Sequence, residues 1–162
     1  MKGLIVYYSR SGVTEKLALA IKDEMEAELI DIQEGKSRSG LTGCLKASWE
    51  SFAERLPDID NTEDKTRYNI SEYDIVIIGT PIWAGNMSSP VRSFIAKYRD
   101  DFQRVAFFCT FGVSGAENAF NNMEILTGRV PEGKLSLRKK EVQSDNVSEK
   151  IRSFLNSFEI EI

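Results

Sequence analysis

Histidine is absent from this chain of 162 residues. Its absence excludes Ser-His-Asp catalysis, general base catalysis by imidazole and most catalytic zinc sites. Cysteine is scarce as well. The two cysteines, Cys44 and Cys109, form neither a CxxC pair nor a metal-ligand spacing. The sequence therefore predicts no metal site and no catalytic side chain, and an enzyme built on it would take its chemistry from a cofactor.

A strong charge of either sign is also missing. The formal net charge is −4 and the isoelectric point is about 5.1, which gives no support for binding to nucleic acid or to an anionic membrane. The apolar run from Gly3 to Tyr8 is too short for a signal peptide or a membrane span. We expect a single domain over residues 1–162, no membrane span and a cytoplasmic location.

Strands and helices are expected to alternate along the chain. The apolar runs Asp74–Gly79 and Val105–Cys109 are typical of central parallel strands, and Lys134–Arg138 alternates as an edge strand does. Further strands are expected at 2–8 and 28–32. Helices are expected at 12–27, from Ser89 as the cap, over 116–123 with Ser114 as a candidate cap if the third loop is an ordinary turn, and after Ser144 or Asp145 as the cap. This order predicts an α/β fold with a doubly wound, five-stranded parallel sheet in a three-layer α/β/α sandwich.

A longer segment, 34–69, separates the second and third expected strands. Apolar residues at helical spacing, ended by Pro57, predict a crossover helix there. Trp49 lies on the apolar face of this helix, where it either fills the core or forms a homodimer contact. Cys44 in the same segment is expected to be an ordinary reduced thiol.

A strand-to-helix junction at the start of the chain predicts an anion site. Its residues are Ser9, Arg10, Ser11, Gly12, Val13 and Thr14. The first amides of a helix lack intrahelical partners and favour negative charge, and the three hydroxyls can donate to phosphate oxygens. The G-x-G-x-x-G fingerprint and the lysine-bearing phosphate loop are both absent. The loop therefore suits the terminal phosphate of a mononucleotide, and the alternative is a helix cap without a ligand.

Two further loops follow strands that would end at the same edge of the sheet. In Thr80–Met87, Trp83 either stacks on a flat heterocycle or folds back as a hydrophobic lid, and Gly85 and Asn86 are suited to left-handed backbone. In Thr110–Gly115, the glycines either let backbone amides reach a ring or form an ordinary turn. The agreement of three loops favours the ligand interpretation.

The three loops, in this order and spacing, resemble those of the flavodoxin-like family, and the resemblance extends over essentially the whole chain. It implies that FMN binds at the carboxyl ends of the strands. The phosphate would lie on Ser9–Thr14, and the isoalloxazine ring would lie against Pro81, Ile82, Trp83, Ala84, Gly85 and Asn86 on one side and Thr110, Phe111, Gly112 and Gly115 on the other. The Arg10 side chain either pairs with the phosphate or points to solvent.

The resemblance implies an FMN-binding flavoprotein that transfers electrons to a redox partner protein or to a small acceptor such as a quinone. Electron-carrying flavodoxins usually have an acid and a Tyr in the third loop, where this chain has Phe111. An NAD(P)H-dependent two-electron reductase of quinones or other small molecules is therefore an alternative. A flavin-free protein-interaction module is the second alternative, because fold alone does not fix function.

Overall fold

The computed structural model describes residues 1–33 and 68–158. The strands are β1 (Gly3–Tyr7), β2 (Ala27–Asp31), β3 (Ile75–Trp83), β4 (Asn86–Met87), β5 (Val105–Phe111) and β6 (Lys134–Arg138). The α-helices are α1 (Val13–Glu24), α3 (Ser89–Tyr98), α4 (Ala116–Thr127) and α5 (Val147–Asn156), and 3-10 helices lie at Ile70–Glu72, Arg99–Asp101 and Glu141–Gln143. The predicted crossover helix, with Cys44 and Trp49, lies outside the described residues.

The sheet confirms the predicted α/β class. Five strands run parallel in the order β2-β1-β3-β5-β6, and β4 pairs antiparallel with the end of β3. Because β2 lies on one side of β1 and β3 lies on the other, the strand order reverses at β1. Open α/β sheets bind ligands beyond the carboxyl ends of the strands at such a reversal.

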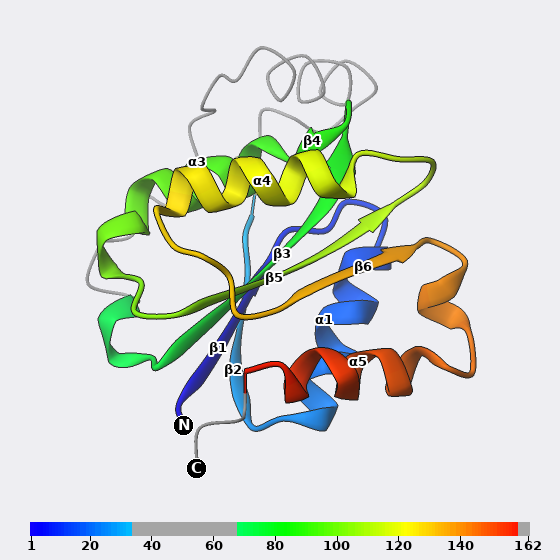
Figure 1. Cartoon of the computed structure of the whole chain (residues 1–162), viewed down its shortest axis with the longest axis horizontal. Coiled ribbons are helices and arrows are strands. Elements are labelled where there is room, and N and C mark those ends of the chain that lie inside the picture. Colours follow the sequence, from blue (N-terminus) through cyan, green and yellow to red (C-terminus); the bar gives the residue numbers. More distant parts are fainter. Residues whose placement is uncertain (34–67, 159–162) are drawn as a thin grey trace.

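Two helix layers cover the two faces of the sheet, with α3 and α4 on one face and α1 and α5 on the other (Figure 1). Alternate residues of each central strand supply the two cores. Val76 and Ile78 of β3 face the layer of α3 and α4, whereas Ile75 and Ile77 face α1 and α5. All four side chains are fully buried, as expected for a strand between two covered faces.

Several boundaries differ from the expected ones. The first helix ends at Glu24 rather than at 27, because Ala27 already pairs with Gly3 in the sheet. The strands β3 and β5 are longer than their apolar runs, since their parallel pairing continues to Pro81 and Thr110.

The N-cap residues of three helices also differ from those that the sequence predicted. The cap positions are Ser88 for α3, Gly115 for α4 and Asn146 for α5. Before α5, the hydroxyl of Ser144 donates 2.7 Å to the Glu141 carbonyl. Ser144 therefore closes a 3-10 turn that sequence periodicity did not predict.

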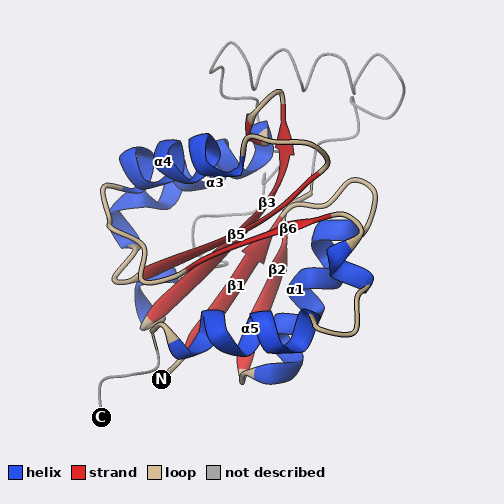
Figure 2. Ribbon diagram, turned by 45° about the vertical axis from the view of Figure 1, so that its right-hand side comes forward, coloured by secondary structure: helices blue, strands red, loops and turns tan. Residues whose placement is uncertain are grey.

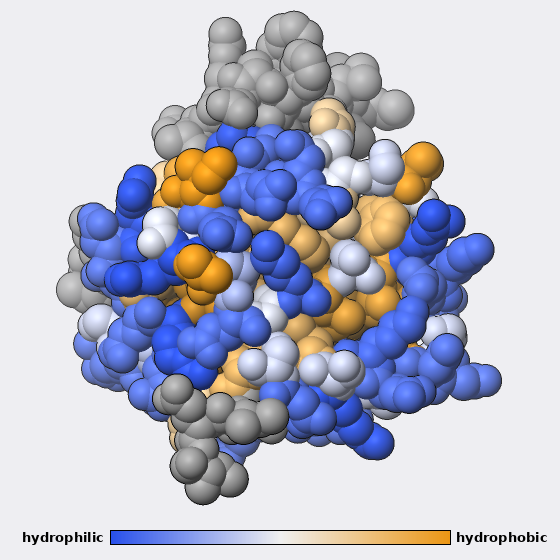
Figure 3. All heavy atoms as spheres, in the orientation of Figure 1, coloured by the Kyte–Doolittle hydropathy of each residue, from blue (hydrophilic) through white to orange (hydrophobic). Residues whose placement is uncertain are grey.

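The edge strand β6 behaves as its alternation predicted. Leu135 and Leu137 are buried, whereas Lys134, Ser136 and Arg138 are exposed. Figure 3 shows apolar atoms in the middle of this face, between the helices above and below, with hydrophilic side chains around them. Charged side chains on an exposed edge disfavour pairing with a strand of another chain.

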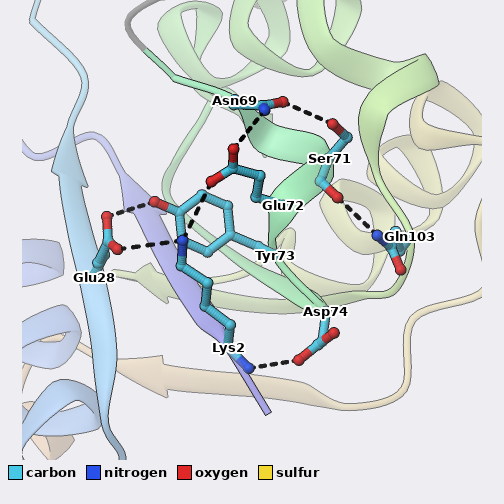
Figure 4. A network of polar contacts seen from close by, with 8 residues as sticks. All are labelled: Lys2, Glu28, Asn69, Ser71, Glu72, Tyr73, Asp74 and Gln103. Atoms are coloured by element: carbon cyan, nitrogen blue, oxygen red, sulfur yellow. Dashed lines mark hydrogen bonds and ion pairs between the residues drawn. The ribbon is translucent and has the colours of Figure 1, made fainter.

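A polar network joins the amino ends of the first three strands (Figure 4). The backbone amide of Lys2 donates 2.6 Å to Asp74, and its ammonium lies 3.8 Å from Glu28 and 3.5 Å from Glu72. The Tyr73 hydroxyl donates 2.5 Å to Glu28. Burial and this bond to a carboxylate raise the pKa of Tyr73 to about 12. The network fixes the start of β3 against β1 and β2.

An acidic side chain ends β2 in a less favourable setting. Asp31 pairs in register with Tyr7, near Glu15 of α1. Desolvation raises the pKa of Asp31, and the negative charge of Glu15 raises it further, against the hydrogen bond from Gln33. The same surroundings, with desolvation foremost, raise the pKa of Tyr7 to about 12.

We predict that Asp31→Asn stabilises the protein at neutral pH. The change removes the desolvated charge and keeps an oxygen that accepts the 2.6 Å bond from Gln33. As pH rises above 3.8, the unfolded chain loses its Asp31 proton before the folded chain does, so the wild type loses stability in that window. The gain is on the order of 0.5 kcal/mol because solvent screens the carboxylate.

Thermal unfolding at neutral pH and below about pH 4 checks this prediction. The stability advantage of Asp31→Asn is expected to disappear at acidic pH, where the Asp31 carboxyl is protonated in both the folded and the unfolded wild type. Asp101→Asn removes the same charge from an exposed site and serves as the control. An advantage that persists unchanged in acid would contradict the electrostatic explanation.

Candidate functional site

The second predicted loop is mostly a β-hairpin. Strand β3 continues through Pro81 and Ile82 to Trp83, turns at Ala84 and Gly85, and returns as β4. Figure 2 shows this hairpin extending beyond the other strands at the carboxyl end of the sheet. The expectation of an irregular loop over 80–87 was therefore wrong, because pairing with β5 and β4 holds these residues extended.

The two turn residues have left-handed backbone. Ala84 has a φ of 49° and Gly85 a φ of 74°, which is the conformation of a tight two-residue hairpin turn. Asn86, which was also expected to be left-handed, instead lies in β4. It is buried, and its side-chain carbonyl accepts 2.8 Å from the amide of Met87. The strain therefore falls on Ala84, a residue that rarely adopts positive φ.

The first predicted loop ends in an uncapped helix. Gly12 precedes α1 with a φ of 84°, and no side chain caps the helix N-terminus. The Ser9 hydroxyl accepts 3.1 Å from the Gly12 amide, which closes the loop on itself. Ser11 is exposed and Val13 half-buried. This arrangement leaves the first amides of α1, at the positive end of the helix dipole, without a side-chain cap.

A buried hydrogen bond joins the first loop to the third. The hydroxyls of Thr14 and Thr110 lie 2.8 Å apart, and both residues are at most 5% exposed. Sequence reasoning assigned Thr14 to a phosphate and Thr110 to a ring, and it did not foresee that the two would bond to each other. The bond places the start of α1 directly beside the end of β5.

The third loop meets the hairpin through two glycines. Gly115 has a φ of 105°, and a Cβ atom built there would lie 2.6 Å from the Cα atom of Gly85. The side-chain amide of Asn118 on α4 then donates 2.9 Å to the Gly85 carbonyl. Sequence reasoning missed Asn118, because an exposed Asn one turn into a helix carries no distinctive signal.

Trp83 lies where the hairpin meets the first loop. Its ring contacts the Tyr8 ring edge-on, with centroids 5.3 Å apart at 88°. The guanidinium carbon of Arg10 lies 5.3 Å from the Trp83 ring centre. Arg10 was expected either to pair with phosphate or to point to solvent; in the structure it is exposed and its guanidinium lies over the indole, a neighbour that the sequence did not predict. Tyr8, read from sequence as an ordinary strand residue, is the other unforeseen neighbour.

The remaining residues of the third loop are open. Phe111 is half-buried with the Arg138 guanidinium 6.0 Å from its ring centre. Gly112 and Val113 are exposed, and a Cβ atom at Gly112 would meet nothing within 4 Å. An aromatic edge and an open stretch of backbone therefore flank the glycine contact.

The first loop, the hairpin and the third loop meet at the carboxyl end of the sheet, which we call the carboxyl rim. Among the described residues, nothing supports nucleophilic or metal chemistry there. Burial raises the pKa of the Cys109 thiol to about 12, so it remains protonated and inert. Within residues 1–33 and 68–158, no group of three acidic, Cys or His side chains could hold a metal ion. No helix in that part of the chain is long and apolar enough to cross a membrane.

The fold and the rim together define an α/β protein with a candidate ligand site at the switch point of a parallel sheet. A family model for flavodoxin matches residues 2–154. The chain therefore belongs to the flavodoxin family, as the resemblance of its loops predicted.

Three solved structures show the same fold. A flavoprotein from Lactobacillus acidophilus NCFM, in complex with FMN, is 23% identical over 86% of this chain and 94% of its own, with a TM-score of 0.69. A WrbA-like flavodoxin from Agrobacterium tumefaciens is 18% identical over 98% and 94%, with a TM-score of 0.62. Oxidised flavodoxin 1 from Bacillus cereus is 17% identical over 100% and 99%, with a TM-score of 0.57.

We predict that Gly115→Ala disrupts the rim and that Gly112→Ala does not. At Gly115 the new methyl meets backbone atoms of Gly85 and requires an unfavourable φ, which is expected to cost about 1–3 kcal/mol. At Gly112 the methyl enters open space, so the change is expected within about 0.5 kcal/mol. Urea unfolding of the two variants measures the difference, and equal stabilities would contradict the close approach.

Proposed function

We propose that this chain binds FMN at the carboxyl rim of its sheet and serves in electron transfer. The observation that carries the proposal is the meeting of three loops that sequence reasoning had selected separately. The Thr14–Thr110 bond joins the first loop to the third, and the contact between Gly85 and Gly115 joins the third to the hairpin. The flavoprotein from Lactobacillus acidophilus NCFM, which shares the fold, was solved with FMN.

The chemistry of the first loop fits a phosphate. Uncapped amides at the start of α1 and the hydroxyls of Ser9, Ser11 and Thr14 are hydrogen-bond donors for anionic oxygens. Thr14 keeps its position through Thr110, since either hydroxyl can serve as the acceptor in that bond. When Thr14 is the acceptor in that bond, its own proton is free to be donated to a phosphate oxygen.

The hairpin and the third loop fit a flat ring. Pro81, Ile82, Trp83, Ala84, Gly85 and Asn86 would line one side, with Trp83 as the stacking surface. Thr110, Phe111, Gly112 and Gly115 would line the other, where backbone amides can approach closely. FMN, when bound, supplies the redox chemistry, which is consistent with a chain that has no His. The side chains bind, orient and shield the ring, and none needs to act as an acid or base.

We predict that Trp83→Ala weakens the binding of FMN and riboflavin by the same factor, roughly tenfold. Stacking on an aromatic side chain is worth about 1–3 kcal/mol per base, and both ligands share the ring that stacks. Quenching of flavin fluorescence on binding measures both dissociation constants. Trp83→Phe keeps a stacking surface and is expected to lose less affinity. An unchanged constant for Trp83→Ala would exclude the stacking role.

Stepwise anaerobic reduction of the FMN-loaded protein tests the electron-transfer role. A carrier is expected to take up its two electrons in separate steps with distinct midpoint potentials, and to oxidise NADPH slowly in the presence of a quinone. A single two-electron step with rapid NADPH-dependent quinone reduction would instead indicate the reductase. Failure to retain any flavin would favour the flavin-free interaction module.

A further inference from the structure

Arg10 stands apart electrostatically on the rim. It is the single charged residue in the loops Ser9–Thr14, Thr80–Met87 and Thr110–Gly115. In the part of the chain that the structure describes, no carboxylate lies within ion-pair distance of Arg10. By contrast, Arg104 pairs with Glu132 and Arg152 with Glu24. Among residues 1–33 and 68–158, no acid therefore pairs with the positive charge of Arg10.

Arg10 lies over the ring of Trp83, which is the surface on which the flavin is proposed to stack. Its guanidinium carbon is 5.3 Å from the centre of the Trp83 ring, and Arg10 itself is exposed. A cation over an indole at an exposed position is only weakly attracted. A charge-assisted hydrogen bond to a phosphate oxygen is stronger, and a guanidinium can form two in parallel. The contact is therefore one that a phosphate dianion can displace.

An acid beside the loop makes such a cation useful. Glu15 in the first turn of α1 places a carboxylate oxygen 3.9 Å from the point where a Gly12 Cβ atom would lie. The whole chain also has a formal net charge of −4. Both repel a phosphate dianion that approaches the start of α1. Arg10, next to Ser9 and Ser11, is positioned to offset this repulsion.

We propose that Arg10 makes the site selective for the phosphorylated flavin: when FMN binds, the Arg10 guanidinium gives up its contact with the Trp83 ring and binds the phosphate instead. The proposal rests on the proposed FMN site. With FMN, Arg10 leaves the indole for the phosphate, and one movement both uncovers Trp83 and fixes the phosphate. With riboflavin, Arg10 has no phosphate to bind and continues to compete for the indole. Arg10 therefore favours FMN and disfavours riboflavin.

The test compares the dissociation constants of FMN and riboflavin for the wild type, Arg10→Ala and Arg10→Lys. We expect Arg10→Ala to weaken FMN about tenfold, which corresponds to about 1.4 kcal/mol, and to bind riboflavin as tightly as the wild type or about twofold more tightly. The FMN affinity of the wild type is expected to fall more steeply with salt than that of Arg10→Ala. Arg10→Lys keeps the charge and is expected to recover part of the preference for FMN.

Two controls separate this role from a general effect of charge. Arg99→Ala removes a positive charge from an exposed position at the C-terminal end of α3, away from the rim. It is expected to leave the ratio of the two dissociation constants unchanged. Without flavin, acrylamide is expected to quench tryptophan emission more strongly in Arg10→Ala than in the wild type, because the indole is uncovered. Both proteins carry Trp49→Phe in this measurement, so that Trp83 is the single tryptophan.

The outcomes distinguish the two proposals. If the wild type binds FMN but Arg10→Ala changes both constants by the same factor, or neither constant, the role of Arg10 is wrong and the FMN site stands. If Arg99→Ala shifts the ratio as much as Arg10→Ala, the preference is a long-range charge effect and the proposal again fails. If the wild type binds neither flavin, the FMN site and the role of Arg10 are both wrong.

Discussion

The rim of this protein depends on the close approach of two backbones, at Gly85 and Gly115. A side chain on Gly115 would overlap Gly85, so the hairpin rests directly on the start of α4, where Asn118 holds the Gly85 carbonyl. The left-handed Ala84 in the same turn is strained by on the order of 1 kcal/mol, and such strain persists only where the surroundings determine the conformation. Trp83, one residue earlier, is thus placed by a backbone contact as much as by its own packing.

The two ends of the sheet have opposite characters. At the amino end, the Lys2 ammonium lies between the carboxylates of Glu28 and Glu72, so this group of charges is negative overall. At the carboxyl rim, hydroxyls, small residues and aromatic rings replace charges, and both α1 and α4 begin without a side-chain cap. Uncapped helix N-termini in weakly charged surroundings favour an anion. The asymmetry supports the proposal that an anionic ligand binds at the rim and not at the amino end.

The sequence predicted the order of strands and helices along the chain, and it predicted that the three candidate loops would meet at one edge of the sheet, because apolar runs and strand-to-helix junctions are local signals. It did not predict that β3 would continue past Gly79, because Pro81, with Ala84 and Gly85 close behind it, resembles a loop until pairing with β5 is known. Nor could it predict the positive φ of Ala84, which Gly115 supports from thirty-one positions further along the chain. The Thr14–Thr110 bond was missed for the same reason, because each hydroxyl has its own local interpretation.

Arg10 shows what a local interpretation leaves out at a site built from several loops. From its sequence neighbours alone, the Arg10 side chain is predicted either to bind a phosphate or to point to solvent. The hairpin adds a third choice, the indole of Trp83, which lies far from Arg10 in sequence. A guanidinium suits both partners, since its plane stacks on an aromatic ring and its fork matches phosphate oxygens, whereas an ammonium offers only a point charge. In the proposed site, an arginine at this position would couple the phosphate loop to the stacking surface, because the guanidinium that lies over the Trp83 ring is also the group that would bind the phosphate.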